Sequence, residues 1–336
     1  MQIHFCGVRG STPAAGIEFV RYGGHTACVA LAHDDVGAPT LVLDAGAGLV
    51  TLSRLLAGAP FIGTIMLSHL HWDHVLGLPF FAAADRPDAY TRVLVPEQDS
   101  GPDHDRESAR DRGVGGSGGA ADAQGSGDAP DTQGNTGTAD AREPTAGWDG
   151  AREATAVLAG FMSPPYFPIE PTQLRGNWTF GTIAPGEHEV ERFTVLAREI
   201  PHKGGRTFGY RVSDGHSTVA YIPDHCPTLL GPGEDGFGEY HAAAIELARD
   251  ADVLIHDAHL FPEELAAEAA YGHSVADYAV ELGRHAGASS VVLFHHRHTR
   301  TDDALDGLAR RWQDASPKVT VAAEGAVIDL AARPTR

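Results

Sequence analysis

The stretch LSHLHWDHVLG, residues 67–77, decides the fold. Directly after an apolar run it places three histidines and one aspartate in six positions: His69, His71, Asp73 and His74. His69 and His71 lie two residues apart, so on extended backbone their side chains point to the same side, and Asp73 and His74 then begin a helix. Imidazole nitrogens combined with a hard carboxylate suit zinc, manganese or iron. The stretch therefore predicts a metal site at the end of a strand.

The remaining ligands of such a site must come from elsewhere in the chain, and three polar residues follow apolar strands in the same way. His202 follows RFTVLAREIP, Asp224 follows STVAYIP, and His295 follows SSVVLF. Sites in α/β proteins are built at the carboxyl ends of strands. We expect these three residues at the same site, where the two oxygens of Asp224 can each bind one of two cations.

The composition excludes some classes of function. The chain has 336 residues, 42% of them hydrophobic, and a formal charge of −20 from 25 basic and 45 acidic side chains. This acidic balance is unlike the basic footprint of a general nucleic-acid binder. The three cysteines have no paired spacing, which fits a reducing compartment, and we find neither a signal peptide nor an uncharged run of about 18 residues. We therefore expect a cytoplasmic protein without a membrane span.

The order of the predicted elements indicates the architecture. Residues 1–95 alternate short apolar runs with glycine-rich turns and one helix, and residues 177–323 alternate further strands with helices, ending in the predicted strand KVTVAAE. Residues 99–152 contain almost no large apolar side chains and predict a disordered insertion in a single domain of residues 1–336. The pattern predicts an α+β fold in which two packed mixed sheets carry helices outside, an αββα sandwich.

The chain resembles the metallo-β-lactamase superfamily, in the branch that contains ribonuclease Z and the cyclic-phosphate phosphodiesterases. The resemblance is carried by GVRGSTP, RYGGHTACV, LVLDAGAG, LSHLHWDHVLGLPFF, PYFPI, PHKGGRTFGYRV, YIPDHCP, LIHDAHL, GHSVADYA and VLFHH. It implies two divalent metal ions, Zn²⁺ first and Mn²⁺ or Fe²⁺ as alternatives. It also implies that His69, His71 and His202 hold one metal while Asp73, His74 and His295 hold the other, with Asp224 and a hydroxide between them.

The resemblance implies further roles at this site. A histidine at the place of His273 contacts the scissile phosphate in the resembling nucleases and helps the leaving group depart, although His273 could also belong to a loop before a helix. Asp73 is expected to bind a metal and to orient the hydroxide. Asp44 is expected to orient the histidine loop rather than to bind a metal.

Several neighbouring residues have two interpretations. Four basic residues are expected near the pocket, where they would favour a phosphodiester substrate: Arg9, Lys203, Arg206 and Arg211. In the alternative interpretation they are solvated loop charges, except that Arg9 donates to backbone carbonyls. Four aromatic residues either stack on a base or pack the stem of the insertion: Phe80, Phe81, Tyr166 and Phe167. The branch commonly has asparagine where this chain has His25, which leaves a substrate contact from that loop open.

The other histidines differ in their place in the sequence. Those beside predicted ligands either donate to a ligand or are solvated: His225, His296 and His298. His256 and Asp257 end a strand, where either can support a ligating imidazole. No role is predicted for His4, His33, His104, His188, His216, His241, His259 and His285.

The favoured function is a dinuclear phosphodiesterase that cleaves a small cyclic or nucleotide-like diester with a metal-bound hydroxide. Because the insertion is acidic and a long basic arm is missing, no stable nucleic-acid complex is expected. The alternatives are a thioesterase or lactonase with the same ligands, an RNA-processing endonuclease, and a non-catalytic metal-dependent binding module. A homodimer is left open.

Overall fold

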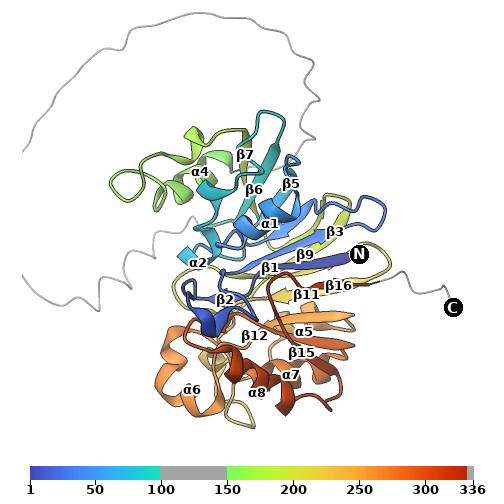
Figure 1. The fold of residues 1–336 in the computed structure, drawn as a ribbon. Coiled ribbons are helices and arrows are strands. Elements are labelled where there is room, and N and C mark those ends of the chain that lie inside the picture. Colours follow the sequence, from blue (N-terminus) through green and yellow to red (C-terminus); the bar gives the residue numbers. More distant parts are fainter. Residues whose placement is uncertain (99–149, 331–336) are drawn as a thin grey trace, which may run out of the picture. The chain divides into compact units, whose positions relative to one another are not determined.

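The computed structural model describes residues 1–98 and 150–330, drawn in colour in Figure 1. Of the described residues, 1–97 and 150–330 form a first compact unit. The predicted insertion lies outside the described residues except for its last three, and helix α4 (Ala151–Ala159) begins before the predicted end of the insertion. The helices and strands that the structure describes belong to the first unit.

Two large sheets form the middle of this unit. Among the described residues, the strands form two seven-stranded sheets and a pair, β2 (Arg9–Gly10) with β14 (His296–Arg297). The first sheet has, in spatial order, β16 (Val327–Asp329), β1 (Gln2–Gly7), β3 (Cys28–Ala32), β4 (Leu41–Leu43), β5 (Ile62–Met66), β6 (Tyr90–Pro96) and β7 (Asn177–Ile183). The second has β15 (Lys318–Val321), β13 (Ser290–Phe294), β12 (Val253–Asp257), β11 (Thr218–Ile222), β10 (Phe208–Ser213), β9 (Phe193–Glu199) and β8 (Gly186–Val190).

Both sheets are mixed. In the first, β4 to β7 pair in parallel and the rest are antiparallel. In the second, β11, β12, β13 and β15 pair in parallel and the rest are antiparallel. The parallel strand β12, VLIHD, is buried along its whole length, as expected for a strand that is covered on both faces. The antiparallel strand β9 alternates buried residues with more exposed ones, as expected for a strand that is covered on one face.

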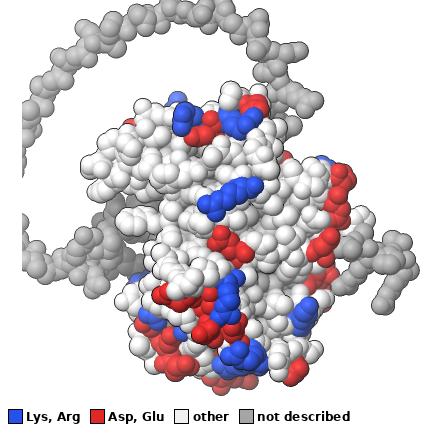
Figure 2. Space-filling model, viewed as in Figure 1, with Lys and Arg blue, Asp and Glu red and all other residues white. Residues whose placement is uncertain are grey.

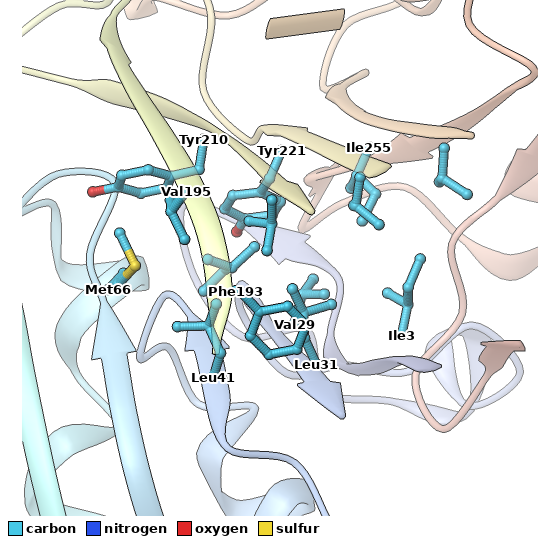
Figure 3. Packing of buried hydrophobic residues seen from close by; sticks show 14 of the residues in the cluster. Ile3, Val29, Leu31, Leu41, Met66, Phe193, Val195, Tyr210, Tyr221 and Ile255 are labelled. Atoms are coloured by element: carbon cyan, nitrogen blue, oxygen red, sulfur yellow. The ribbon is translucent and has the colours of Figure 1, made fainter. Parts of the chain in front are cut away.

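The sheets pack face to face over an apolar core. Figure 3 shows side chains from the first sheet, such as Val29, Leu31 and Met66, meeting Phe193 and Tyr221 from the second. All five are fully buried. This layer supplies most of the hydrophobic driving force that holds the two sheets together.

Helices cover the outer faces (Figure 1). On the first sheet these are α1 (Leu49–Leu55), α2 (Trp72–Val75) and α4, and on the second α5 (Ala242–Ala248), α6 (Pro262–Glu268), α7 (Ala276–Ala286) and α8 (Asp302–Arg311). Short 3₁₀ segments are η1 (Ile17–Phe19), η2 (Leu78–Phe80), η3 (Pro171–Gln173), η4 (Pro227–Leu230) and η5 (Ala269–Tyr271). The predicted αββα sandwich is confirmed. Within the described residues, no helix has the length and apolar character needed to span a membrane.

The sequence patterns missed several short strands. The edge strand β8, GEHEV, has charged residues where an apolar alternation would be expected, and β16 is only three residues long. The strand predicted to close the chain is β15, but the chain then returns to the first sheet, where β16 pairs antiparallel with β1. The start and the end of the fold therefore share one sheet.

Candidate metal centre

The seven residues predicted as metal ligands lie in one cluster at the carboxyl ends of strands from both sheets. His69, His71, Asp73 and His74 follow β5 of the first sheet, whereas His202, Asp224 and His295 follow β9, β11 and β13 of the second. Their side chains are buried, except for that of His71, which is half-buried. The ligand atoms of two subsets each lie within 4.8 Å of one another: His69, His71, His202 and Asp224, and Asp73, His74 and His295.

The carboxylate of Asp224 stands between these two subsets. Its Oδ2 lies 3.4 Å from Nε2 of both His69 and His202, and its Oδ1 lies 3.3 Å from Nε2 of His74 and 2.9 Å from Nε2 of His295. Ligand bonds of 2.0–2.1 Å in a tetrahedron separate neighbouring ligand atoms by about 3.4 Å. The spacing therefore fits two ligand shells that share one carboxylate.

The other distances within each subset agree with this arrangement. Nε2 of His202 lies 3.2 Å from Nδ1 of His71. On the other side, Oδ2 of Asp73 lies 3.3 Å from Nε2 of His74 and 3.0 Å from Nε2 of His295. Each subset thus surrounds a small space with nitrogen and oxygen donors.

Neighbouring groups fix which ring nitrogen of each histidine faces this space. His202 Nδ1 donates to the carbonyl oxygen of Gly272 at 2.7 Å, and His74 Nδ1 donates to Asp44 Oδ2 at 2.7 Å. The Ser68 hydroxyl donates to Asp44 at 2.9 Å, so it accepts from Nδ1 of His69 at 3.0 Å. When these three rings are neutral, the lone pair of each is on Nε2, the atom that faces Asp224, which is how ligating histidines are held.

Asp44 accepts several of these hydrogen bonds and orients the histidine loop, as predicted. Besides His74 and the Ser68 hydroxyl, it accepts from the Ser68 amide at 2.6 Å and from the Tyr221 hydroxyl at 2.8 Å. These bonds use its oxygens and aim His74 at the cluster. Asp44 therefore orients a predicted ligand and does not face the ligand shells itself.

Backbone strain accumulates around the cluster. Asp44, His295 and Ser11 have φ angles of 63°, 58° and 67°, in the left-handed region that residues other than glycine rarely adopt. The Ser11 amide donates to Asp73 Oδ2 at 2.7 Å, which explains one of these conformations. Non-glycine residues hold such angles only where surrounding contacts compensate the cost, and such residues concentrate at functional sites.

Gly10 permits the close approach of His295. A Cβ atom at Gly10 would lie 2.2 Å from both Nδ1 and Cε1 of His295, closer than any side chain could tolerate. The GVRGSTP turn, through β2 and its partner β14, therefore sets the place of the imidazole. This explains why the residue after Arg9 in β2 is a glycine.

The charges of the cluster call for a cation. Nε2 of His69 and Oδ1 of Asp224 are buried and make no hydrogen bond within the described residues. Burial lowers the pKa of His69, and likewise of His71 and His202, to about 4, so these rings are neutral and their lone pairs available. Nε2 of His74 and of His295 lie 3.2 Å apart, and two lone pairs repel at that distance unless a proton or a metal lies between them. The donor set fits two divalent ions.

The pKa values of Asp224 and His295 show that this cluster stabilises positive charge. Burial alone would raise the pKa of Asp224, but the surrounding imidazoles of His295, His74 and His69 hold it well below its usual range. Burial alone would lower the pKa of His295, but Asp224 and Asp73 raise it to about 10. Positive charge is therefore stabilised where the second subset converges.

An open pocket of about 710 Å³ leads to the cluster, and His273 lines it. The His273 ring is buried and not in a solvated loop, and its Nδ1 donates to Asp257 Oδ2 at 3.1 Å. Asp257 also accepts from the amides of His225, His259 and Ser274. The carboxylate thus holds the His273 ring in one orientation and leaves its Nε2 available to the pocket.

His259 is a residue of the pocket for which the sequence predicted no role. Its ring stacks on that of His273 with centroids 4.1 Å apart and planes 17° apart, and its Nδ1 donates to the carbonyl oxygen of His295 at 3.1 Å. The same rule that selected Asp224 and His295 would have found it, because His259 follows the apolar strand β12. The ligand atoms of His259, His273 and His295 also lie within 4.8 Å of one another.

Three of the four cations predicted near the pocket contact protein groups elsewhere. Arg9 is fully buried and donates to the carbonyl oxygens of Gly23 and Arg300, so its alternative interpretation is correct. Arg206 pairs with Glu199, and Arg211 donates to the carbonyls that end α5. None of these three, nor Lys203, lines the pocket, and the prediction of a cationic cluster there is wrong. The pocket's arginine in the described chain is Arg297, which pairs with Glu268 at 3.0 Å.

The remaining histidines divide clearly. His298 lines the pocket, but His25 bonds to Glu324 at 2.7 Å and His296 to the Ala322 carbonyl at 2.9 Å, both away from the ligands. His225 contacts His256 at 2.9 Å and His241 at 2.8 Å. These three rings form a hydrogen-bonded chain, buried at His225 and His256 and half-buried at His241, and they do not bond to the predicted ligands.

Among the four predicted aromatic residues, Phe81 belongs to the core. It is fully buried and lies 5.1 Å from the Phe61 ring, centroid to centroid. Phe80, Tyr166 and Phe167 line a second pocket. Of the two interpretations, packing therefore holds for Phe81, whereas stacking on a base stays a prediction for the other three.

Comparisons with known proteins show which family this chain is similar to. Residues 154–296 match the model of the beta-lactamase superfamily domain. Ribonuclease Z of Geobacillus kaustophilus is 36% identical over 200 residues, which are 48% of this chain and 65% of the relative, so the match spans less than two thirds of that enzyme.

Solved structures show the same fold. A diphosphatase from the PhnP family has a TM-score of 0.59 and 13% identity, covering 98% of this chain and 97% of its own. The short form of human tRNase Z has a TM-score of 0.54 and 18% identity, covering 98% and 99%. The family match, the sequence relative and the fold agree with the resemblance carried by LSHLHWDHVLG: the chain is similar to the metallo-β-lactamase superfamily, in the branch that includes ribonuclease Z.

Proposed function

We propose that this protein is a metal-dependent hydrolase that cleaves a small phosphodiester. One observation carries the proposal: the two oxygens of Asp224 each face a different set of donors, next to a pocket that holds the His273 and Asp257 pair. The names of the relatives support a phosphate-containing substrate, since a ribonuclease cleaves phosphodiester bonds and a diphosphatase acts on a diphosphate. The similarity to the family supports hydrolysis as the reaction.

The residues that would hold the metals are indicated by the distances. His69, His71 and His202 would hold one ion and Asp73, His74 and His295 the other, with Asp224 shared. We propose Zn²⁺ first, because nitrogen-rich buried sites suit it, with Mn²⁺ and Fe²⁺ as alternatives. Two such ions lower the pKa of a shared water and neutralise the charge that builds on a phosphoryl oxygen.

Asp73 orients the attacking water. The Ser11 amide donates to Asp73 Oδ2 and fixes that carboxylate against the cluster. Asp73 lines the pocket, where a carboxylate oxygen can accept a hydrogen bond from water and direct its lone pair toward phosphorus. Neighbouring imidazoles hold the pKa of Asp73 well below its usual range, although burial alone would raise it, so the group stays an acceptor.

His273 completes the reaction. When the bond from phosphorus to the leaving oxygen breaks, that oxygen takes a proton from Nε2 of the protonated His273. Asp257, bonded to Nδ1 of the same ring, stabilises the charged imidazole before the transfer. The chain needs no covalent intermediate for this hydrolysis.

RNA cleavage is the second candidate, because the sequence relative is a ribonuclease. Against a large RNA stands the charge of −20. On the face shown in Figure 2, Lys and Arg side chains are scattered among acidic ones and do not form a band that could follow a phosphate backbone. We therefore favour a small diester.

Hydrolysis of bis-p-nitrophenyl phosphate by the zinc-loaded protein tests the proposal. We expect release of p-nitrophenolate that a chelator abolishes and added Zn²⁺ restores. Cleavage of a thioester or lactone without cleavage of the diester would overturn it. Faster turnover of a tRNA precursor than of cyclic and linear dinucleotides would favour the ribonuclease.

A further inference from the structure

A second, apolar pocket adjoins the metal centre. It has a volume of about 560 Å³. Its walls come from helix α2, segment η2 and the loop after α4: Trp72, Leu76, Pro79, Phe80, Gly160, Phe161, Met162, Tyr166 and Phe167. Within the described chain, none of these side chains is charged.

Trp72 is a wall of both pockets. It lies in the sequence between His71 and Asp73, and it lines the 710 Å³ pocket together with those two predicted ligands. A molecule whose phosphate is at the metal centre can therefore place an attached group against the other side of the indole. The two pockets are neighbours because α2 carries both the ligands and the wall.

Three aromatic side chains of this second pocket are largely exposed to solvent. Trp72, Phe80 and Tyr166 are 74%, 59% and 80% exposed. The Phe80 and Phe167 rings stand edge to face, with centroids 6.0 Å apart and planes at 87°. Large apolar groups gathered in a concave surface beside a reactive site are typical of ligand pockets.

The chain's own segment is a poor occupant. In the sequence of residues 99–149 the large apolar side chains are Val114 and Trp148, and most of the others are small or acidic. Such a composition offers almost no apolar surface with which to fill a pocket of this kind. A planar ring, by contrast, stacks on an aromatic wall and needs no charged partner.

We propose that this pocket binds an aromatic ring on the non-leaving arm of the phosphodiester, a nucleobase or an aryl group. The inference rests on the proposed function, because it takes the metal centre as the place of the phosphate. The substrate is then a diester with a polar phosphate held at the ligands and a flat ring held between Trp72 and Phe80. This explains why uncharged aromatic residues, and not cations, flank the histidine stretch.

The test compares diesters that share one leaving group. The substrates are the p-nitrophenyl diesters of methanol, of phenol and of thymidine at its 5′ oxygen. Phe80→Ala is the main variant, since Phe80 lies outside the ligand stretch, and Tyr166→Ala repeats the test from the other wall. Tyr90→Ala is the matched control, because Tyr90 is 61% exposed on β6 and lines neither pocket.

We expect each pocket variant to lower kcat/KM for an aromatic arm about tenfold relative to the methyl arm, whereas the control leaves the ratio unchanged. A loss confined to the thymidine diester identifies a nucleobase, and a loss for both aromatic arms identifies a general aryl site. Equal loss for all three arms would overturn the inference, because Phe80 would then act on the shared p-nitrophenyl leaving group or through the fold, and not on the non-leaving arm.

A binding measurement separates this inference from the proposed function. Calorimetry with the zinc-loaded protein should show phenylphosphonate binding about tenfold more tightly than methylphosphonate, with the difference lost in Phe80→Ala. If that preference is found but no diester is cleaved, the proposed reaction fails and the ring pocket stands. If diesters are cleaved and the two phosphonates bind equally, the ring pocket fails and the reaction stands.

Discussion

Several histidines of the centre have a second partner that decides what each of them can do. His74 and His69 turn Nε2 toward Asp224 because Asp44 and Ser68 occupy their Nδ1 atoms, and Asp257 does the same for His273. The first two rings face the ligand shells, whereas the third faces the open pocket. Metal binding and proton transfer are therefore expected to depend on different histidines.

The division of roles predicts opposite outcomes for two alanine variants. His69→Ala removes a predicted ligand and should lose both metal and turnover. His273→Ala should keep the metal content of the wild type and lose about 10²- to 10⁴-fold in kcat, the usual contribution of a general acid. Metal analysis by atomic absorption and diester kinetics on the same samples check this. Equal metal loss in both variants would contradict it.

The support of His74 by Asp44 gives a second prediction. Asp44→Asn keeps the size of the side chain but removes the charge that accepts from His74, Ser68 and Tyr221. Loss of such a partner typically weakens metal affinity by about 10- to 100-fold. Competition with a zinc chelator measures the change. Asp35→Asn, an exposed residue paired with Arg192, is the control and should leave the affinity unchanged.

At the residue scale, the sequence predicted which residues lie together at the metal centre. It failed for residues whose role depends on the direction of the side chain. The seven residues converge because each directly follows β5, β9, β11 or β13, which a sequence shows. Tertiary contacts decide whether a charged side chain turns to the pocket or to a backbone carbonyl. Arg211 therefore bonds to the end of α5, although its sequence neighbourhood matched the family.

Among the elements, a chain of three histidines, two of them buried, links α5 to β11 and β12. His256 Nδ1 donates to the Asp257 carbonyl at 2.8 Å, so its Nε2 accepts from His225 Nδ1, and His225 Nε2 accepts from His241. Every nitrogen of His225 and His256 is used, and all three rings are neutral in this pattern. A further proton on His256 would set two N–H groups against each other.

This chain predicts a loss of stability in acid. Burial lowers the pKa of His256 from its ordinary value of 6.5 to about 4. A depressed histidine pKa means that the unfolded chain binds the proton more readily, so the free energy of unfolding is largest above about pH 6.5 and falls as the pH drops toward about 4. This one group contributes on the order of 3 kcal/mol to that fall.

Urea unfolding at several pH values compares wild type with His256→Gln, which keeps hydrogen-bonding atoms but does not titrate. We expect the variant to be less stable at pH 7.5 and to lose less stability between pH 6.5 and pH 4.5. The same slope in both proteins would show that His256 is not neutral in the fold.

Element prediction from the sequence succeeded where apolar patterns are long and failed at the margins. β12 and β13 are uniformly apolar before their polar ends, and the sequence showed both. The edge strand β8 alternates glutamate with other polar residues, and its pairing with β9 decides its conformation. Edge strands carry charged side chains as protection from aggregation, which removes the pattern by which they would be found.

At the scale of the whole molecule, the centre joins the two sheets. Asp224 belongs to the second sheet and lies between His69 and His74 of the first. Each proposed metal would therefore be held from both sides of the apolar core. Metal binding that needs both sheets in place stabilises only the folded state.

Chelation should consequently lower the melting temperature. Occupancy at about 100 times the dissociation constant contributes about 2.7 kcal/mol per site, and one kcal/mol shifts Tm by about 2 °C or more in a domain of this size. Differential scanning calorimetry with and without EDTA should therefore show a fall of at least about 5 °C. His273→Ala, which retains both ligand sets, should show the same fall, whereas His69→Ala should start lower and respond less. A chelator that leaves the wild-type Tm unchanged while abolishing turnover would mean that the ions are held by one sheet, and that the shared position of Asp224 does not join the two.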